Sequence, residues 1–77
     1  MVSYNKITGI FEFSPIEARV WCARLKIPAE CMKKHEYGSP AFYACLLRMK
    51  GLEVVQVGRS FLRVKEKPNR VWEALAT

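Results

Sequence analysis

The segment Val54–Lys65, which reads VVQVGRSFLRVK, decides the fold. Its two halves are rich in β-branched residues and alternate between apolar and polar side chains, which is typical of strands. Gly58-Arg59 between the halves predicts a two-residue type II′ turn that pairs Val57 with Ser60. In that register one face carries Val55 and Leu62, and the other carries Gln56, Phe61 and Arg63. The sequence therefore predicts a basic β-hairpin over residues 52–65.

Two helices are predicted directly before this hairpin. Ser39-Pro40 joins a capping serine to a proline at the first helical position, so it predicts a helix over residues 39–50. Pro28 starts a shorter helix over residues 28–36, because proline fits the first helical position and breaks whatever helix precedes it. A glycine between the two helices supplies the tight turn that joins them.

Another helix begins the helical region. Ser14-Pro15-Ile16-Glu17 places a glutamate three residues after a capping serine, which is a capping box. Apolar residues recur at helical spacing as far as Ile27, so this helix is predicted over residues 14–26, with Trp21 in the core. Residues 14–50 are therefore expected to hold three helices.

Both ends of the chain are predicted to be structured. Within residues 1–13, Ile7, Phe11 and Phe13 occupy odd positions, which indicates a strand or an extended arm able to extend the sheet of the hairpin. Residues 68–76 begin with a proline and continue with apolar residues at helical spacing, so they predict a short terminal helix with its tryptophan in the core.

Charge indicates the class of partner. The 77-residue chain carries 13 basic and 7 acidic side chains, a net charge of +6, and residues 48–77 hold seven of the basic and three of the acidic ones. Such an excess attracts polyanions and is typical of nucleic-acid-binding proteins. No uncharged run is long enough to cross a bilayer and no leader pattern begins the chain, so a cytoplasmic protein without a membrane partner is expected.

The polar residues form no recognisable catalytic set. The chain has one histidine, no aspartate and no glycine-rich phosphate loop before a helix, so we expect no enzyme, no cofactor and no small-molecule substrate. Cys22, Cys31 and Cys45 are odd in number and lie among apolar residues, which argues for buried, reduced thiols and against a disulfide. The alternative is a metal site joining these thiols to His35, but the cysteine spacings match no zinc motif, so no metal is expected.

The order of these elements resembles the winged helix-turn-helix superfamily, and the resemblance covers residues 28–64. It rests on the short helix that ends at Glu36-Tyr37-Gly38, the Ser39-Pro40 cap, the helix end at Met49-Lys50-Gly51-Leu52 and the hairpin with Gly58-Arg59 at its tip. The resemblance implies an α+β fold, with a three-helix core, a C-terminal wing, an N-terminal strand and a short terminal helix, in one domain over residues 1–77.

In this superfamily the third helix enters the major groove and the wing tip reaches the backbone or the minor groove. Small size also makes the chain similar to bacteriophage and plasmid regulators. The resemblance therefore implies a protein that binds double-stranded DNA, as a homodimer or on DNA already occupied by another protein, and regulates transcription, recombination or replication. The candidate DNA contacts are Lys33, Lys34, Ser39, Tyr43, Arg48, Lys50, Arg59, Arg63, Lys65, Lys67 and Arg70. Arg59 is the most informative of them, because an arginine at a wing tip can enter a narrow minor groove.

The third helix leaves two orientations open, because it is poor in polar residues. In one, its bulky side is core and a small-residue side bearing Arg48 approaches DNA. In the other, the small side packs inward and the aromatic side, with Phe42, meets a partner. The second orientation defines an alternative function, a protein-binding inhibitor or adaptor that blocks a host protein through this helix or through Trp72 of the terminal helix. RNA binding is a weaker alternative, because only Phe61 could stack on bases from the hairpin.

Overall fold

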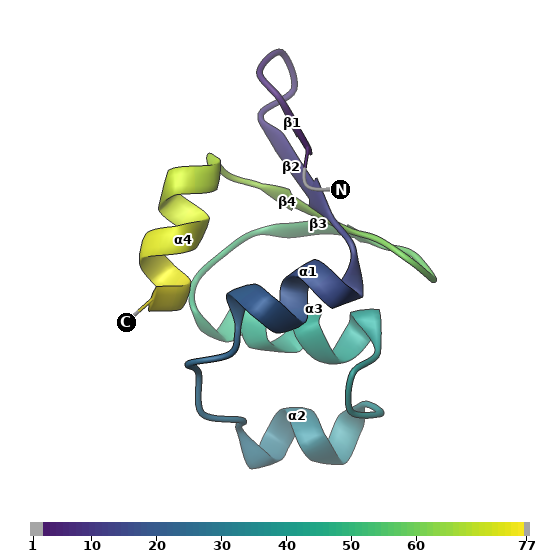
Figure 1. The fold of residues 1–77 in the computed structure, drawn as a ribbon. Coiled ribbons are helices and arrows are strands. Elements are labelled where there is room, and N and C mark those ends of the chain that lie inside the picture. Colours follow the sequence, from purple (N-terminus) through teal and green to yellow (C-terminus); the bar gives the residue numbers. More distant parts are fainter. Residues whose placement is uncertain (1–2, 77) are drawn as a thin grey trace.

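The computed structural model describes residues 3–76, which form four helices and a four-stranded antiparallel sheet (Figure 1). This confirms the predicted α+β class. The elements, in chain order, are β1 (Ser3–Asn5), β2 (Ile10–Phe13), α1 (Pro15–Trp21), α2 (Ala29–Lys34), α3 (Pro40–Met49), β3 (Val54–Val57), β4 (Leu62–Lys65) and α4 (Pro68–Ala76). Residues 1, 2 and 77 of the predicted elements and domain lie outside the described part of the chain.

The N-terminal segment is a hairpin, where a single strand or arm was predicted. Asn5 closes its turn, since its side-chain oxygen accepts a hydrogen bond from the backbone N–H of Ile7 at 2.9 Å, and Gly9 supplies a positive φ of 73°. Ile7 therefore lies at the tip and is 96% exposed, so its place in the apolar pattern was misleading. Phe11 and Phe13 follow the pattern and are fully buried.

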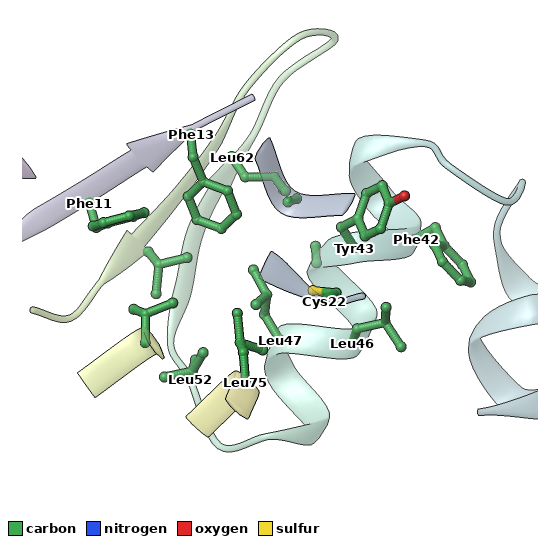
Figure 2. Close-up of a cluster of buried hydrophobic side chains, with 14 of the residues drawn as sticks. Phe11, Phe13, Cys22, Phe42, Tyr43, Leu46, Leu47, Leu52, Leu62 and Leu75 are labelled. Carbon is green, nitrogen blue, oxygen red and sulfur yellow. The ribbon is translucent and has the colours of Figure 1, made fainter. Parts of the chain in front are cut away.

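The sheet has the strand order β1-β2-β4-β3, so the N-terminal hairpin joins the C-terminal one through β2 and β4. Phe11 lies opposite Val64 and Phe13 opposite Leu62. These four side chains are buried on the face of the sheet that packs against the helices, as Figure 2 shows for Phe11, Phe13 and Leu62. The addition of the N-terminal strand to the predicted hairpin is therefore confirmed.

The β3–β4 hairpin forms where it was predicted, but its register differs by two residues. Val57 lies opposite Leu62, and the backbone N–H of Gly58 donates to the carbonyl of Phe61 at 2.9 Å, so the turn centres on Arg59 and Ser60. The predicted pairing of Val57 with Ser60 is wrong. A shift of two residues preserves the alternation of faces from Gln56 to Arg63, so these two side chains still share a face, whereas the irregularity before Gln56 sets Val54 instead of Val55 opposite Val64.

The turn residue Gly58 has a role other than the predicted one. It lacks the positive φ that a type II′ turn requires. Instead, a Cβ at this position would lie 2.2 Å from the Phe61 ring, so glycine makes room for that ring. On β3 the pairing is irregular between Val54 and Gln56, which leaves a bulge at Val55.

The capping predictions are confirmed, whereas two helix lengths are not. At α1, the backbone N–H of Ser14 donates to Glu17 Oε1 at 2.9 Å, and Ser14 Oγ accepts from the Glu17 N–H at 3.2 Å. The helix ends at Trp21 rather than residue 26, because the chain turns at Cys22 and thereby packs Leu25 against the core. Helix α2 covers only residues 29–34 of the predicted 28–36.

A disulfide joins α2 to α3, contrary to the predicted reduced thiols. It links Cys31 with Cys45, whose Cα atoms lie 5.8 Å apart, and leaves Cys22 as a buried free cysteine. The disulfide uses the sulfur atoms of two of the three cysteines that the alternative metal site with His35 would need. Residues 3–76 contain no cluster of three or more candidate metal ligands. No helix in the described part of the chain is long and apolar enough to cross a membrane.

Helix α3 lies at the centre of the core (Figure 2). It packs against α1, α2 and β3. Phe42, Leu46 and Leu47 are buried on it, as the bulky-side-inward orientation predicts. Helix α4 closes the core with two residues, Val71 and Leu75.

Candidate nucleic-acid interface

The exposed cations of the C-terminal third lie along the β3–β4 hairpin and its continuation into α4. Arg59 occupies the tip of the hairpin, Lys65 ends β4, and Lys67 and Arg70 lie at the start of α4. All four are exposed, and none forms an ion pair with another residue of the described range 3–76. The structure thus leaves four charges available to a polyanion on this part of the surface.

Arg63 differs from these four, because its guanidinium is bonded to side chains of the neighbouring strands. Its Nε donates to Glu12 Oε2 on β2, and its Nη1 donates to Gln56 Oε1 on β3. The guanidinium also lies over the Phe61 ring, 4.6 Å from the centroid. Arg63 therefore ties three strands together, which leaves its guanidinium engaged rather than free for the predicted phosphate contact.

The two lysines of α2 are exposed and lie apart in sequence from the wing. Lys34 Nζ is 3.2 Å from Glu30 Oε1, and both side chains are more than 60% exposed. A surface pair of this kind contributes little to stability and exchanges readily for another anion. Lys33 is exposed beside it.

The candidate residues of α3 fall into two groups. Arg48 and Lys50 are exposed at the C-terminal end of the helix. Ser39 is half-buried, and its hydroxyl accepts a hydrogen bond from the Phe42 N–H at 3.1 Å, so it acts as a helix cap. Tyr43 is only 4% exposed, and burial raises the pKa of its phenol, so the structure places it in the core and away from any DNA surface.

Neither predicted orientation of α3 describes the whole helix. The bulky side is core at Phe42 and Leu46, as the first required, but Met49 on that side is exposed. On the small-residue side Cys45 is bonded to α2 and Ala44 is buried. The second orientation is wrong, since Phe42 is 1% exposed and leaves no aromatic face of α3 for a partner. Only the last turn of α3, with Arg48, remains open to a DNA groove.

The terminal helix offers one large aromatic side chain. Trp72 is 52% exposed, so its predicted place in the core is wrong. Its ring meets the half-buried ring of Trp21 edge-on, with the centroids 5.4 Å apart, and this contact joins α4 to α1.

The sequence pattern missed exposed apolar residues on α1. Ile16 and Val20 belong to the apolar residues at helical spacing that predicted this helix, yet they are 77% and 68% exposed, and the helix instead buries Ala18. The composition of α1 could have indicated this exposure, because its apolar residues are spread around the helix and cannot all face the core. Ile16 and Val20 border a groove of about 570 Å³ between α1 and α3.

Comparisons with protein-family models, curated proteins and solved structures gave no match for this chain.

Proposed function

We propose that the protein is a small DNA-binding protein of the winged helix-turn-helix type, which binds double-stranded DNA chiefly through the β3–β4 wing and serves to regulate transcription, recombination or replication. The observation that carries the proposal is a set of four exposed cations that form no ion pair within residues 3–76 and run from the tip of the β3–β4 hairpin into α4: Arg59, Lys65, Lys67 and Arg70. The small-residue side of α3 is largely covered, because Cys45 is bonded to α2 and Ala44 is buried. Contacts to the DNA phosphate backbone therefore dominate over contacts to the bases, and any sequence preference comes from DNA shape.

The order of elements supports the same proposal. Two helices joined by a glycine turn lead directly into a two-stranded wing, and an N-terminal strand extends the wing's sheet through β4. Arg48 and Lys50, at the end of α3, add two exposed cations close in sequence to the start of β3. In this arrangement Arg63 holds the wing on the sheet instead of touching DNA.

The salt dependence of binding to a short duplex tests the proposal. Four phosphate contacts give a slope of roughly −3.6 in log K against log salt, so affinity should fall about 150-fold between about 50 and about 200 mM salt. Arg59→Ala should reduce the slope by about 0.9, because it removes one phosphate contact.

Lys6→Ala is the matched control, since Lys6 is an exposed cation on the turn of the other hairpin, which points away from the wing in Figure 1. It should leave the slope unchanged. If the two variants alter the slope equally, the attraction is a property of net charge alone, and the proposed wing contact is wrong.

A further inference from the structure

Helix α1 exposes an apolar ridge that the core does not use. Ile16 and Val20 lie one turn apart on it, and both are more than two-thirds exposed. Pairs spaced in this way form the ridge that packs against a second helix. The helix already buries Ala18 and packs Trp21 against the core on its other side, so the ridge is additional to what the fold requires.

The ridge borders a continuous apolar groove. Ile27 and Tyr37 line the rest of its rim, and Leu46 of α3 contributes to its wall. A second hollow of about 460 Å³ adjoins the first, because both are lined by Leu25 and Leu46. Ile27 and Tyr37 are about half exposed. The groove therefore presents apolar surface from α1, α3 and the segment after α1 across two adjoining hollows.

The charges along this groove have one sign. Arg19 lines the first hollow, and Arg24, Lys26 and Lys50 line the second. No acidic side chain of the described residues lines either hollow. An occupant must therefore offer apolar side chains to the floor and carboxylates to the rim.

We propose that this groove docks an amphipathic helix of a partner protein, with acidic residues flanking its apolar face. Helix-in-groove recognition needs an apolar cleft for side chains at helical spacing, and complementary charge at the rim sets the orientation of the helix. The groove lining excludes Arg59 and the other wing cations, and of the cations proposed to contact DNA it includes only Lys50, so the wing and the groove are separate surfaces.

Two other occupants fit the groove less well. A second copy of the chain carries the same net charge of +6, and a two-fold contact between grooves would set the cationic rim of one against the cationic rim of the other. Single-stranded nucleic acid stacks its bases on aromatic side chains, whereas the exposed rim consists of Ile16, Val20 and Ile27 with one aromatic, Tyr37.

The test uses the full chain labelled with ¹⁵N and two synthetic amphipathic helices of about five turns. Both peptides carry leucine at helical spacing, and they differ only in having glutamate or lysine at the flanking positions. The glutamate peptide should shift the amide signals of residues 16–27 and 37 and bind at least about tenfold more tightly than the lysine peptide. Equal binding of the two peptides, or shifts confined to the wing, would overturn the proposal.

Variants of the groove distinguish specific docking from nonspecific hydrophobic binding. Ile16→Ala with Val20→Ala should weaken the glutamate peptide about tenfold or more and leave the fold intact, because both side chains are exposed and alanine favours helix. Ile7→Ala is the matched control, because Ile7 is exposed on the turn between β1 and β2; it should change nothing. Arg19→Glu should weaken binding of the glutamate peptide and strengthen binding of the lysine peptide.

Three further outcomes would also overturn the proposal. The first is an unchanged affinity for the glutamate peptide in the Ile16→Ala, Val20→Ala variant. The second is a groove that responds to oligo-dT but not to the glutamate peptide, which would assign it to single-stranded nucleic acid. The third is concentration-dependent dimerisation that the same variant abolishes, which would assign it to a second copy of the chain. The wing variant Arg59→Ala should bind the glutamate peptide normally, so this test is independent of the DNA proposal.

Discussion

Removing the Cys31–Cys45 disulfide should cost the protein about 3 kcal/mol of unfolding free energy. The bond joins residues 14 apart in sequence. Loop-closure entropy assigns about 3 kcal/mol at 25 °C to a closed loop of about 15 residues. Domains of this size are stable by only about 4 to 12 kcal/mol, so the bond supplies a quarter or more of the total. The midpoint of thermal unfolding should fall by roughly 12 to 24 °C.

Urea unfolding of the oxidised protein, the reduced protein and the Cys31→Ala, Cys45→Ala variant measures this loss. The reduced protein and the variant should lose a similar amount, and reductant should leave the variant unaffected. Hydrogen exchange should show α2 opening first after reduction, because Cys31 is the only residue that this six-residue helix buries. If oxidised and reduced protein unfold at the same urea concentration, or if three thiols titrate in the urea-unfolded protein before reductant is added, this reasoning is refuted.

Four other predictions concern single side chains. Cys22 should resist alkylation near neutral pH until the protein unfolds, because burial raises the pKa of its thiol to about 11; mass spectrometry with and without urea checks this. Ser14→Ala should lower the unfolding free energy by about 1 kcal/mol, as seen by urea titration, since it removes a helix cap. The backbone N–H of Ser14 lowers the pKa of the Glu17 carboxyl below its usual 4.5. The ionised carboxylate therefore stabilises the fold above pH 4.5, and this stabilisation is lost as the pH falls through the lower pKa of the folded protein. In the Glu17→Gln variant, urea titrations across this pH range should show a smaller acid-induced loss of unfolding free energy. Gly58→Ala should destabilise the protein by about 1 kcal/mol in the same assay and displace the ring of Phe61, detected by NMR, because the added methyl group would overlap that ring.

Local signals predicted most of the elements. Ser14 and Ser39, each followed by proline, mark the starts of α1 and α3 within one residue, because capping depends only on neighbours in the chain. The hairpin around Gly58 and the helix after Pro68 are likewise local, and both form. The end of α1 was not predictable in this way. The helix ends before Cys22, and the turn that follows packs Leu25 against the core. A longer helix over residues 14–26 would have satisfied the local sequence pattern equally well.

The missed features all depend on distances through space. Spacing along the chain does not reveal that α2 and α3 place Cys31 beside Cys45. The engagement of Arg63 follows from the register of β4 against β2, which sets it opposite Glu12, more than fifty residues earlier. Of the candidate DNA contacts, charge in the sequence located the exposed cations correctly, but it could not show that Tyr43 faces the core.

The pairing of β2 with β4 sets the order in which the chain can fold. Phe11 and Phe13 are synthesised well before the strand that pairs with theirs, Leu62–Lys65. A contact between segments so far apart in sequence forms slowly, because the loop between them must close first. The sheet therefore assembles only after Leu62–Lys65 has left the ribosome, and until then the edge of β2 that pairs with β4 stays open to chaperones and to other nascent chains.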